Sequence, residues 1–294
     1  MTELAVGAST AAGKADSLDR VAKRVVEISS LPQVALRVLE VAQNPDAGAA
    51  DLKCVVEGDP SLSARLLRLI NSAAYAVRSQ ITSLHQAISY LGFSQVRNLA
   101  MTASVADIFK QGAEIGPYKR SELWRHLLSV GLCARLVAMR NRMRNFDDAF
   151  LAGLLHDIGI ILEDQHCHEQ FEATMLALDG TKPLCEVERA QMGFDHTTLG
   201  AAIAEKWRFP AVVAVAIRHH HASEKYTGDG ADVVRCVEIG NVICTLKGIS
   251  SVGQKLLKPP TAAVQAFGFS KDDLIVLAKD LDQEISQNKG LFDL

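Results

Sequence analysis

Two polar residues interrupt the most apolar helical stretch of the chain. Residues 149–162 read AFLAGLLHDIGIIL, in which His156 and Asp157 stand among leucines and isoleucines and Gly159 follows. A buried imidazole and carboxylate cost free energy unless hydrogen bonds or a bound cation satisfy them. The pair therefore indicates a metal site or, as the structural alternative, a histidine at a helix end that bonds its neighbour.

Further candidate ligands follow in the same half of the chain. His126 falls in the helical sequence ELWRHLLSVGLCARLVA, one turn after Glu122, so the two side chains can point at one site. His196 precedes a helix in FDHTTLGAAIAEKW. The sequence AIRHHHAS ends another helix with His219, His220 and His221.

Imidazole and carboxylate together suit Fe, Mn or a similar ion, and these residues are numerous enough to hold one or two. Each residue alone also fits a structural role. His126 could be a satisfied core histidine, His196 a turn residue, and the histidine triplet a solvated helix end stabilised by the helix dipole.

The elements that must position these residues are predicted to be helices throughout, so the expected fold class is all-α. Apolar residues recur at helical spacing, and capping residues mark helix starts, as at Asp59 with Pro60 and at Ser270 with Asp273. One continuous helix is expected over 147–163. The sequence QGAEIGPY at 111–118 breaks the pattern, so two helical lobes are expected at 17–112 and 113–247. They lie between a flexible tail at 1–16 and a C-terminal connection and helix at 248–294 that pack on the second lobe.

Composition narrows the function classes. The chain has 294 residues, 48% of them hydrophobic, and a net charge of −3, so a large core is expected without general attraction to nucleic acid or anionic membranes. Nucleic-acid binding through arginines of the first lobe is a weak hypothesis, because no aromatic platform accompanies them. These arginines are Arg65, Arg68, Arg78 and Arg97.

The cysteines and the terminal sequences indicate the cellular compartment in which the protein is expected. Six cysteines form no CxxC, and no leader or apolar run of about 18 residues is visible. A cytoplasmic protein without membrane anchoring is expected.

The polar constellation resembles the HD superfamily of metal-dependent phosphohydrolases, with His126 as its first histidine and LLHDIG as its His-Asp pair. It is similar to the HD-GYP branch, which hydrolyses cyclic di-GMP, in having Glu122 and His196 where that branch has additional ligands. HHHAS stands near the paired histidines of that branch, matched here to His220 and His221, with His219 as the alternative register.

Three departures from that branch imply lost catalysis. VVRCVEIGNVICTL places Asn241 where the resemblance implies a closing aspartate, so one ligand becomes a neutral amide. Ile160 stands where the catalytic branch has a phosphate-facing lysine, and EKYTGDGAD replaces the GYP motif. The metal should bind more weakly, and no residue is assigned a catalytic role.

Together with the first lobe, the pattern resembles the HDOD family, a divergent HD branch of bacterial signalling proteins generally regarded as lacking hydrolase activity. The resemblance covers about residues 25–245. It rests on LPQVALRVLEVAQNPDA, DPSLSARLLRLINSAAY, ITSLHQAISYLGFSQVRNLAM, LAGLLHDIG, DHTTLGAAIAEKWRFP and AIRHHHAS. It implies an N-terminal helical bundle joined to an HD-like lobe.

The resemblance implies a regulatory module that acts through a signalling partner protein or a ligand such as a nucleotide, with a degenerate metal site. The alternative is a phosphohydrolase that acts on a cyclic dinucleotide or a nucleotide. The expected metal ligands are Glu122, His126, His156, Asp157, His196, His220, His221 and Asn241.

Overall fold

A computed structural model describes residues 18–28, 31–44, 46–72, 75, 77, 79–110, 112, 114–253, 256 and 258–293. Over these ranges the regular structure is helical, and the only β pairing is an isolated bridge between Ile115 and Tyr118. The predicted all-α fold class is confirmed. The predicted tail at 1–16 and the side chain of Arg78 lie outside the described residues.

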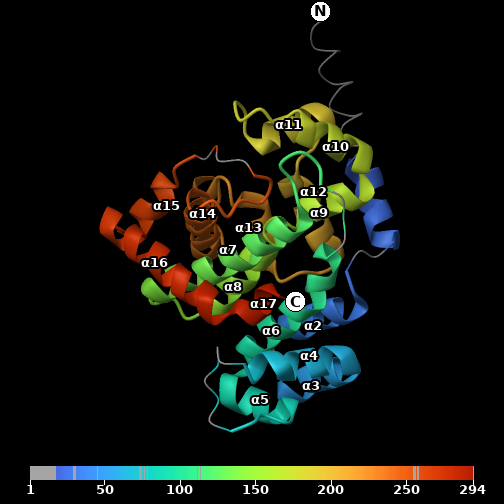
Figure 1. Cartoon of the computed structure of the whole chain (residues 1–294), viewed down its shortest axis with the longest axis vertical. Helices are drawn as coiled ribbons and strands as arrows, with labels where there is room; N and C mark the ends of the chain where they lie inside the picture. The colour runs from blue at the N-terminus through green and yellow to red at the C-terminus, as the bar shows by residue number, and fades with distance from the viewer. Residues whose placement is uncertain are drawn as a thin grey trace, which may run out of the picture.

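The helices of the first lobe gather around one buried helix at one end of the molecule (Figure 1). After a helix at 18–28 come α2 (Gln33–Gln43), α3 (Ala49–Glu57), α4 (Pro60–Ile70), α5 (Leu84–Leu91), α6 (Phe93–Val105) and the 3₁₀ helix η2 (Ala106–Phe109). The Asp59 side chain accepts from the Leu62 N–H and Pro60 opens α4, as the sequence predicts. Every residue of α6 from Val96 onward is buried.

The second lobe is built on helices that cross the centre of the molecule (Figure 1). These and the C-terminal helices are α7 (Arg120–Arg140), α8 (Phe146–Leu155), α9 (Ile158–His166), α10 (His168–Leu176), α11 (Leu184–Gln191), α12 (His196–Lys206), α13 (Ala211–His219), η3 (Ser223–Lys225), α14 (Ala231–Leu246), α15 (Thr261–Ala266), α16 (Lys271–Gln287) and α17 (Lys289–Phe292). Helix α7 packs against both α8 and α14.

Glycines let these central helices approach closely. A Cβ atom at Gly153 of α8 would lie 2.8 Å from Gly131 Cα of α7 and 2.9 Å from the Val130 carbonyl oxygen. A Cβ at Gly240 of α14 would lie 3.2 Å from the Ala134 nitrogen of α7. The close contacts bring the backbone of α7 next to that of α8, so that His126 of α7 can reach the end of α8.

The expectation of one helix over 147–163 is wrong, because the chain turns at the His-Asp pair. Helix α8 ends at Leu155 and α9 begins at Ile158, while Asp157 has a φ of −101° and a ψ of 22°. The turn lets α9 lie directly against α12. A Cβ at Gly159 would lie 2.0 Å from the His196 carbonyl oxygen, so only glycine fits this contact.

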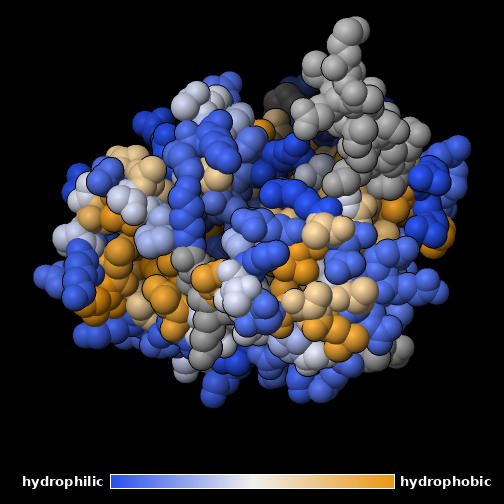
Figure 2. Space-filling model, turned by 90° about the horizontal axis from the view of Figure 1, so that it is seen from above, coloured by the Kyte–Doolittle hydropathy of each residue, from blue (hydrophilic) through white to orange (hydrophobic). Residues whose placement is uncertain are grey.

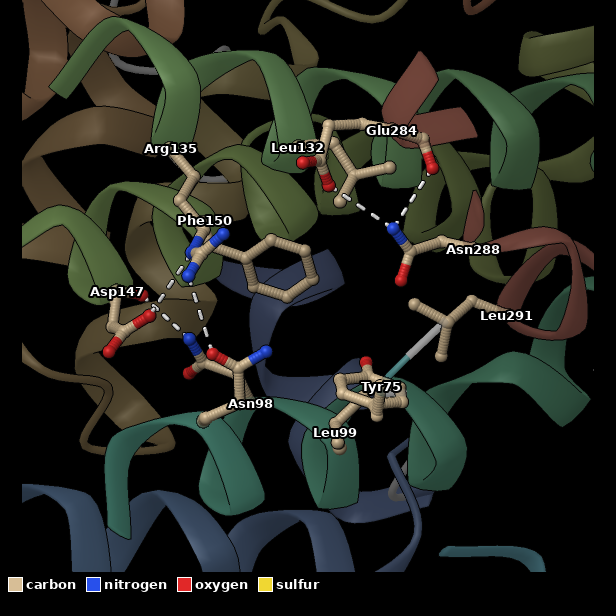
Figure 3. A pocket seen from close by; sticks show the side chains of 11 residues that line it. Tyr75, Asn98, Leu99, Leu132, Arg135, Asp147, Phe150, Glu284, Asn288 and Leu291 are labelled. Atoms are coloured by element: carbon tan, nitrogen blue, oxygen red, sulfur yellow. Dashed lines mark hydrogen bonds and ion pairs between the residues drawn. The ribbon is translucent and has the colours of Figure 1, made fainter. Parts of the chain in front are cut away.

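The C-terminal helices join both lobes. Ser270 and Asp273 form the predicted capping box of α16, which packs against α7 and buries Leu277 and Leu281. A cavity of about 40 Å³ lies where the first lobe, α7, α8 and the C-terminal helices meet (Figure 3). Its lining includes Tyr75 and Leu99 from the first lobe, Arg135 and Phe150 from α7 and α8, and Glu284, Asn288 and Leu291 from the C-terminal helices.

Exposed apolar side chains are spread over several helices, with Leu176 on α10, Leu246 on α14 and Ile275 on α16. Figure 2 shows the face seen from the α10–α11 end as largely hydrophilic, with hydrophobic residues in separate groups. Within the described ranges, no helix combines the length and the apolar character needed to cross a membrane.

The close approach of α7 and α8 gives a stability prediction. We expect Gly153→Ala to lower the free energy of unfolding by about 1–3 kcal/mol, because the added methyl group meets backbone atoms that cannot move aside. The measurement is urea unfolding followed by circular dichroism. Gly58→Ala is the control, because its Cβ would make only ordinary contacts of 3.4 Å at a φ of −66°. Equal stability of the two variants would contradict the account.

Candidate metal centre

One buried carboxylate lies at the centre of a histidine cluster. Asp157 Oδ2 lies 3.7 Å from His126 Nε2 and 3.3 Å from His156 Nε2. Asp157 Oδ1 lies 3.4 Å from His196 Nε2 and 3.1 Å from His220 Nε2. The two oxygens of Asp157 therefore face two different pairs of imidazoles.

A further histidine completes the cluster at its solvent side. His221 is an exposed residue, and its Nε2 lies 3.0 Å from Nε2 of both His196 and His220. His219, the alternative register, instead stacks on Tyr226 with ring centroids 5.1 Å apart. The structure therefore brings to the cluster the two histidines that the sequence comparison with HD-GYP selects.

Separate helices supply the clustered residues, so the site depends on tertiary packing. His126 comes from the second turn of α7, and His156 and Asp157 form the turn between α8 and α9. His196 is the first residue of α12, next to the Asp195 side chain that caps that helix. His220 and His221 directly follow α13.

Backbone carbonyl groups orient three of the rings. Nδ1 of His126 lies 2.8 Å from the Ile249 oxygen, Nδ1 of His156 lies 2.7 Å from the Gly153 oxygen, and Nδ1 of His220 lies 3.0 Å from the Ile217 oxygen. A carbonyl oxygen can only accept, so each Nδ1 carries the proton and donates it. The Nε2 lone pair of a neutral ring then points toward Asp157.

A carboxylate orients the fourth ring. Nδ1 of His196 lies 2.7 Å and 2.9 Å from the two carboxylate oxygens of Glu188. The backbone N–H of His196 also donates to Glu188 Oε2 at 3.1 Å. Glu188 therefore fixes both the ring and the backbone of His196.

The electrostatics favour a cation at Asp157. Burial, together with the nearby His156, lowers the pKa of His126 to about 4, and burial also lowers the pKa of His220. Burial alone would raise the pKa of Asp157, but His156 and its neighbours hold it well below its usual value. Burial likewise opposes a charge on His196, but Glu188 raises the pKa of His196 to about 9. At neutral pH the site thus holds an ionised carboxylate beside the neutral imidazoles of His126 and His220, whereas His196 carries a proton that a bound metal ion would displace.

The residues fit a metal ion. Within the described part of the chain, the buried atoms His126 Nε2, His156 Nε2 and Asp157 Oδ1 have no hydrogen-bond partner. Buried polar atoms are normally paired, and divalent cations on the two sides of Asp157 would use these lone pairs. Two positions result, each with ligand atoms within 4.8 Å of one another. We call them the inner position (His126, His156 and Asp157) and the outer position (Asp157, His196, His220 and His221).

The outer position opens into a cavity of about 490 Å³, which is large enough for a small organic ligand. The four residues of the outer position line it, whereas His126 and His156 do not. Other lining residues are Arg189 of α11, Lys225 of η3, Asn241 and Thr245 of α14, and Ser250, Ser251 and Lys258 of the segment that follows.

Comparison with known proteins identifies the family. A sequence profile of the HDOD domain matches residues 28–223. The chain belongs to the HDOD family. The HDOD chain is also 24% identical over 212 residues to an uncharacterized protein of Treponema pallidum (strain Nichols), a match that covers 70% of this chain and 40% of that protein. The chain thus spans less than half the length of this curated relative.

Solved structures share the HDOD fold. An HDOD domain protein of unknown function from Geobacter sulfurreducens is 26% identical, with a TM-score of 0.76 over 93% of this chain and 96% of that one. A protein from Marinobacter aquaeolei VT8, for which a signal-transduction function has been suggested, is 26% identical, with a TM-score of 0.74 over 96% of this chain and 64% of that one. A protein from Shewanella amazonensis SB2B with a suggested phosphohydrolase function has a TM-score of 0.68 over 93% of this chain and 97% of that one, and its 21% identity shows the fold alone.

Two expected ligands of the HDOD chain lie elsewhere. Glu122, in the first turn of α7, has a 48% exposed side chain 3.7 Å from Arg125, and it belongs to neither metal position. Asn241 is buried and lines the cavity, but it also belongs to neither position. Its amide oxygen lies 3.4 Å from Thr245 Oγ1.

Two groups that hold the ring histidines were not predicted from the sequence: Glu188, which holds His196, and the Ile249 carbonyl group, which holds His126. Neither belongs to a local pattern. Glu188 lies in the charged helix α11, where a glutamate has no special spacing, and any residue can supply a backbone carbonyl group.

The place of Glu122 can be tested by metal affinity. We expect Glu122→Gln to bind a divalent metal as the unaltered protein does, because its side chain lies outside both positions. His156→Ala should weaken binding by more than the roughly 10–100-fold that loss of an outer-shell partner costs. Calorimetric titration of the metal-free variants with Mn²⁺ measures both. A Glu122→Gln variant as weak as His156→Ala would show that Glu122 reaches the metal.

Proposed function

We propose that this HDOD protein is a signal-transduction module whose second lobe binds one or two Fe or Mn ions and which acts through binding rather than hydrolysis. The unpartnered lone pairs of His126, His156 and Asp157 support the metal site most directly. A core without a metal would bury these atoms at a cost that ordinary packing avoids.

The donor set favours a transition metal. Five imidazoles and one carboxylate surround the two positions, and imidazole suits Fe better than it suits the harder Mg²⁺ or Ca²⁺. The carboxylate suits Fe and Mn alike. When bound, such an ion supplies a positive centre that can attract and orient an anionic ligand in the cavity.

Two residues argue against hydrolysis. Asn241 contributes no charge to the cavity wall at the place where the family resemblance implies an aspartate. Ile160, which stands in place of a lysine, is fully buried in the core, so this position supplies no cation to a phosphate. Phosphoryl transfer depends on groups that position and neutralise the phosphate. The protein should therefore retain a ligand more readily than hydrolyse it.

A phosphohydrolase acting on a nucleotide or cyclic dinucleotide is the second candidate, and the cavity lining favours it. Arg189, Lys225 and Lys258 come from three separate segments and line the cavity beside the outer position. Two of these cations already form ion pairs. Arg189 pairs with Asp195, and Lys258 lies 2.5 Å from Glu224. The same lining would let a non-catalytic protein hold a nucleotide as a signal.

We further propose a cytoplasmic protein whose output passes to a signalling protein partner. All six cysteines are free thiols, as a reducing compartment would keep them. The suggested signal-transduction function of the Marinobacter aquaeolei protein, at 26% identity, agrees with this role.

Metal analysis combined with a turnover assay tests the proposal. We expect protein purified without oxygen to carry Fe or Mn at near-stoichiometric level and to leave a cyclic dinucleotide uncleaved. Turnover by the metal-loaded protein that His156→Ala abolishes would establish the hydrolase instead. Protein that neither retains nor binds either metal would refute the metal site.

The role of Asn241 is tested by restoring a charge. We expect Asn241→Asp to tighten metal binding about tenfold, because it adds a charged oxygen ligand to the wall of the cavity into which the outer position opens. Ser251→Asp is the control, since it adds the same charge to the lining of the same cavity from another segment. Equal effects of the two changes would show that charge alone matters and that Asn241 does not stand at a ligand position.

A further inference from the structure

The ligand histidines differ in what holds their outer ring nitrogen. His126, His156 and His220 donate to neutral backbone carbonyl groups, whereas His196 donates to the Glu188 carboxylate. A carboxylate partner makes an imidazole a stronger electron donor toward a metal than a carbonyl group does. His196 therefore gives the outer position a more strongly electron-donating metal ligand than any histidine of the inner position.

A second buried carboxyl group stands behind Glu188. Glu163 of α9 is fully buried, and as a carboxylate neither of its oxygens has a hydrogen-bond partner among the residues that the structure describes. Glu188, also fully buried, lies within hydrogen-bonding reach of it. Two charged carboxylates in this contact would repel each other and lose their hydration.

One proton resolves this conflict. If Glu163 is protonated, its O–H donates to Glu188, and the pair carries a single negative charge that faces His196. Burial and the adjacent Glu188 both raise the pKa of Glu163 well above its usual value, in agreement with this arrangement. The chain of contacts then runs from Glu163 through Glu188 and His196 to the outer position.

We propose that Glu163 is a positioning residue of the metal centre, which holds Glu188 against His196 and so makes the outer position the first to bind a metal ion. This inference rests on the proposed metal site and adds the order in which its two positions fill. The outer position also has four protein groups, against three at the inner position, and it opens into the cavity by which an ion can enter.

The main experiment is calorimetric titration of the metal-free full chain with Mn²⁺. We expect a tighter and a weaker class of binding, with the tighter class weakened by His221→Ala and the weaker class by His126→Ala. Glu163→Leu should weaken the tighter class about 10–100-fold and leave the weaker class unchanged. Glu163→Gln should restore most of the affinity, because its amide N–H can still donate to Glu188.

Asp164→Asn is the matched control, because Asp164 is a buried carboxylate next in sequence that pairs with Arg120 at 2.6 Å and Tyr118 at 2.9 Å rather than with Glu188. It should leave both classes of binding unchanged. Circular dichroism and thermal unfolding of each variant report whether the protein is folded.

Infrared spectroscopy of the metal-free protein tests the shared proton independently of metal. We expect the carbonyl stretch of a protonated carboxylic acid at neutral pH, lost in Glu163→Gln. Absence of this band, equal affinity of Glu163→Leu and the unaltered protein, or a tighter class that depends on His126 instead of His221 would each overturn the inference alone. Unaltered protein that binds no Mn²⁺ would overturn the proposed function and this inference with it.

Discussion

The second lobe depends on burying the Asp157 carboxylate among imidazoles. An isolated carboxylate in this place would be costly, and the surrounding rings hold its pKa well below the usual value. Each buried ring has its outer nitrogen bound to a carbonyl or carboxylate group, so the inner nitrogens have little freedom to turn away. These polar groups are satisfied best when bound cations accept the lone pairs of both Asp157 oxygens and of the inner nitrogens of the neighbouring imidazoles.

The helical framework serves this cluster through close backbone contacts. Glycine at 131 and 153 lets α7 lie against α8, and Gly159 lets α9 lie against the first residue of α12. The segment after α14 contributes the Ile249 carbonyl group to His126 and also lines the cavity. The metal centre is thus tied to the C-terminal part of the chain, beyond the residues that match the HDOD profile.

Local chemistry made much of the fold predictable from the sequence. The caps at Asp59 and Ser270 act through neighbouring residues, and both helices begin where they predict. The break after Leu155 was not predictable, because an apolar helical pattern continues through it and the turn depends on contact with α12. Among the residues of the two metal positions, His126, His156 and Asp157 stand out in the sequence as polar groups in apolar helical stretches, whereas His196, His220 and His221 stand out only as histidines at helix ends. Glu163 and Glu188 were missed, because only the folded chain brings α9 and α11 together behind His196.

The most direct test of the central claim is anomalous diffraction from crystals of the full chain soaked in Mn²⁺. We expect a peak beside Asp157, His196, His220 and His221, and at higher Mn²⁺ concentration a second peak beside His126, His156 and the other oxygen of Asp157. Crystals that show no peak beside Asp157, or that bind Mn²⁺ through Glu122, would contradict this claim.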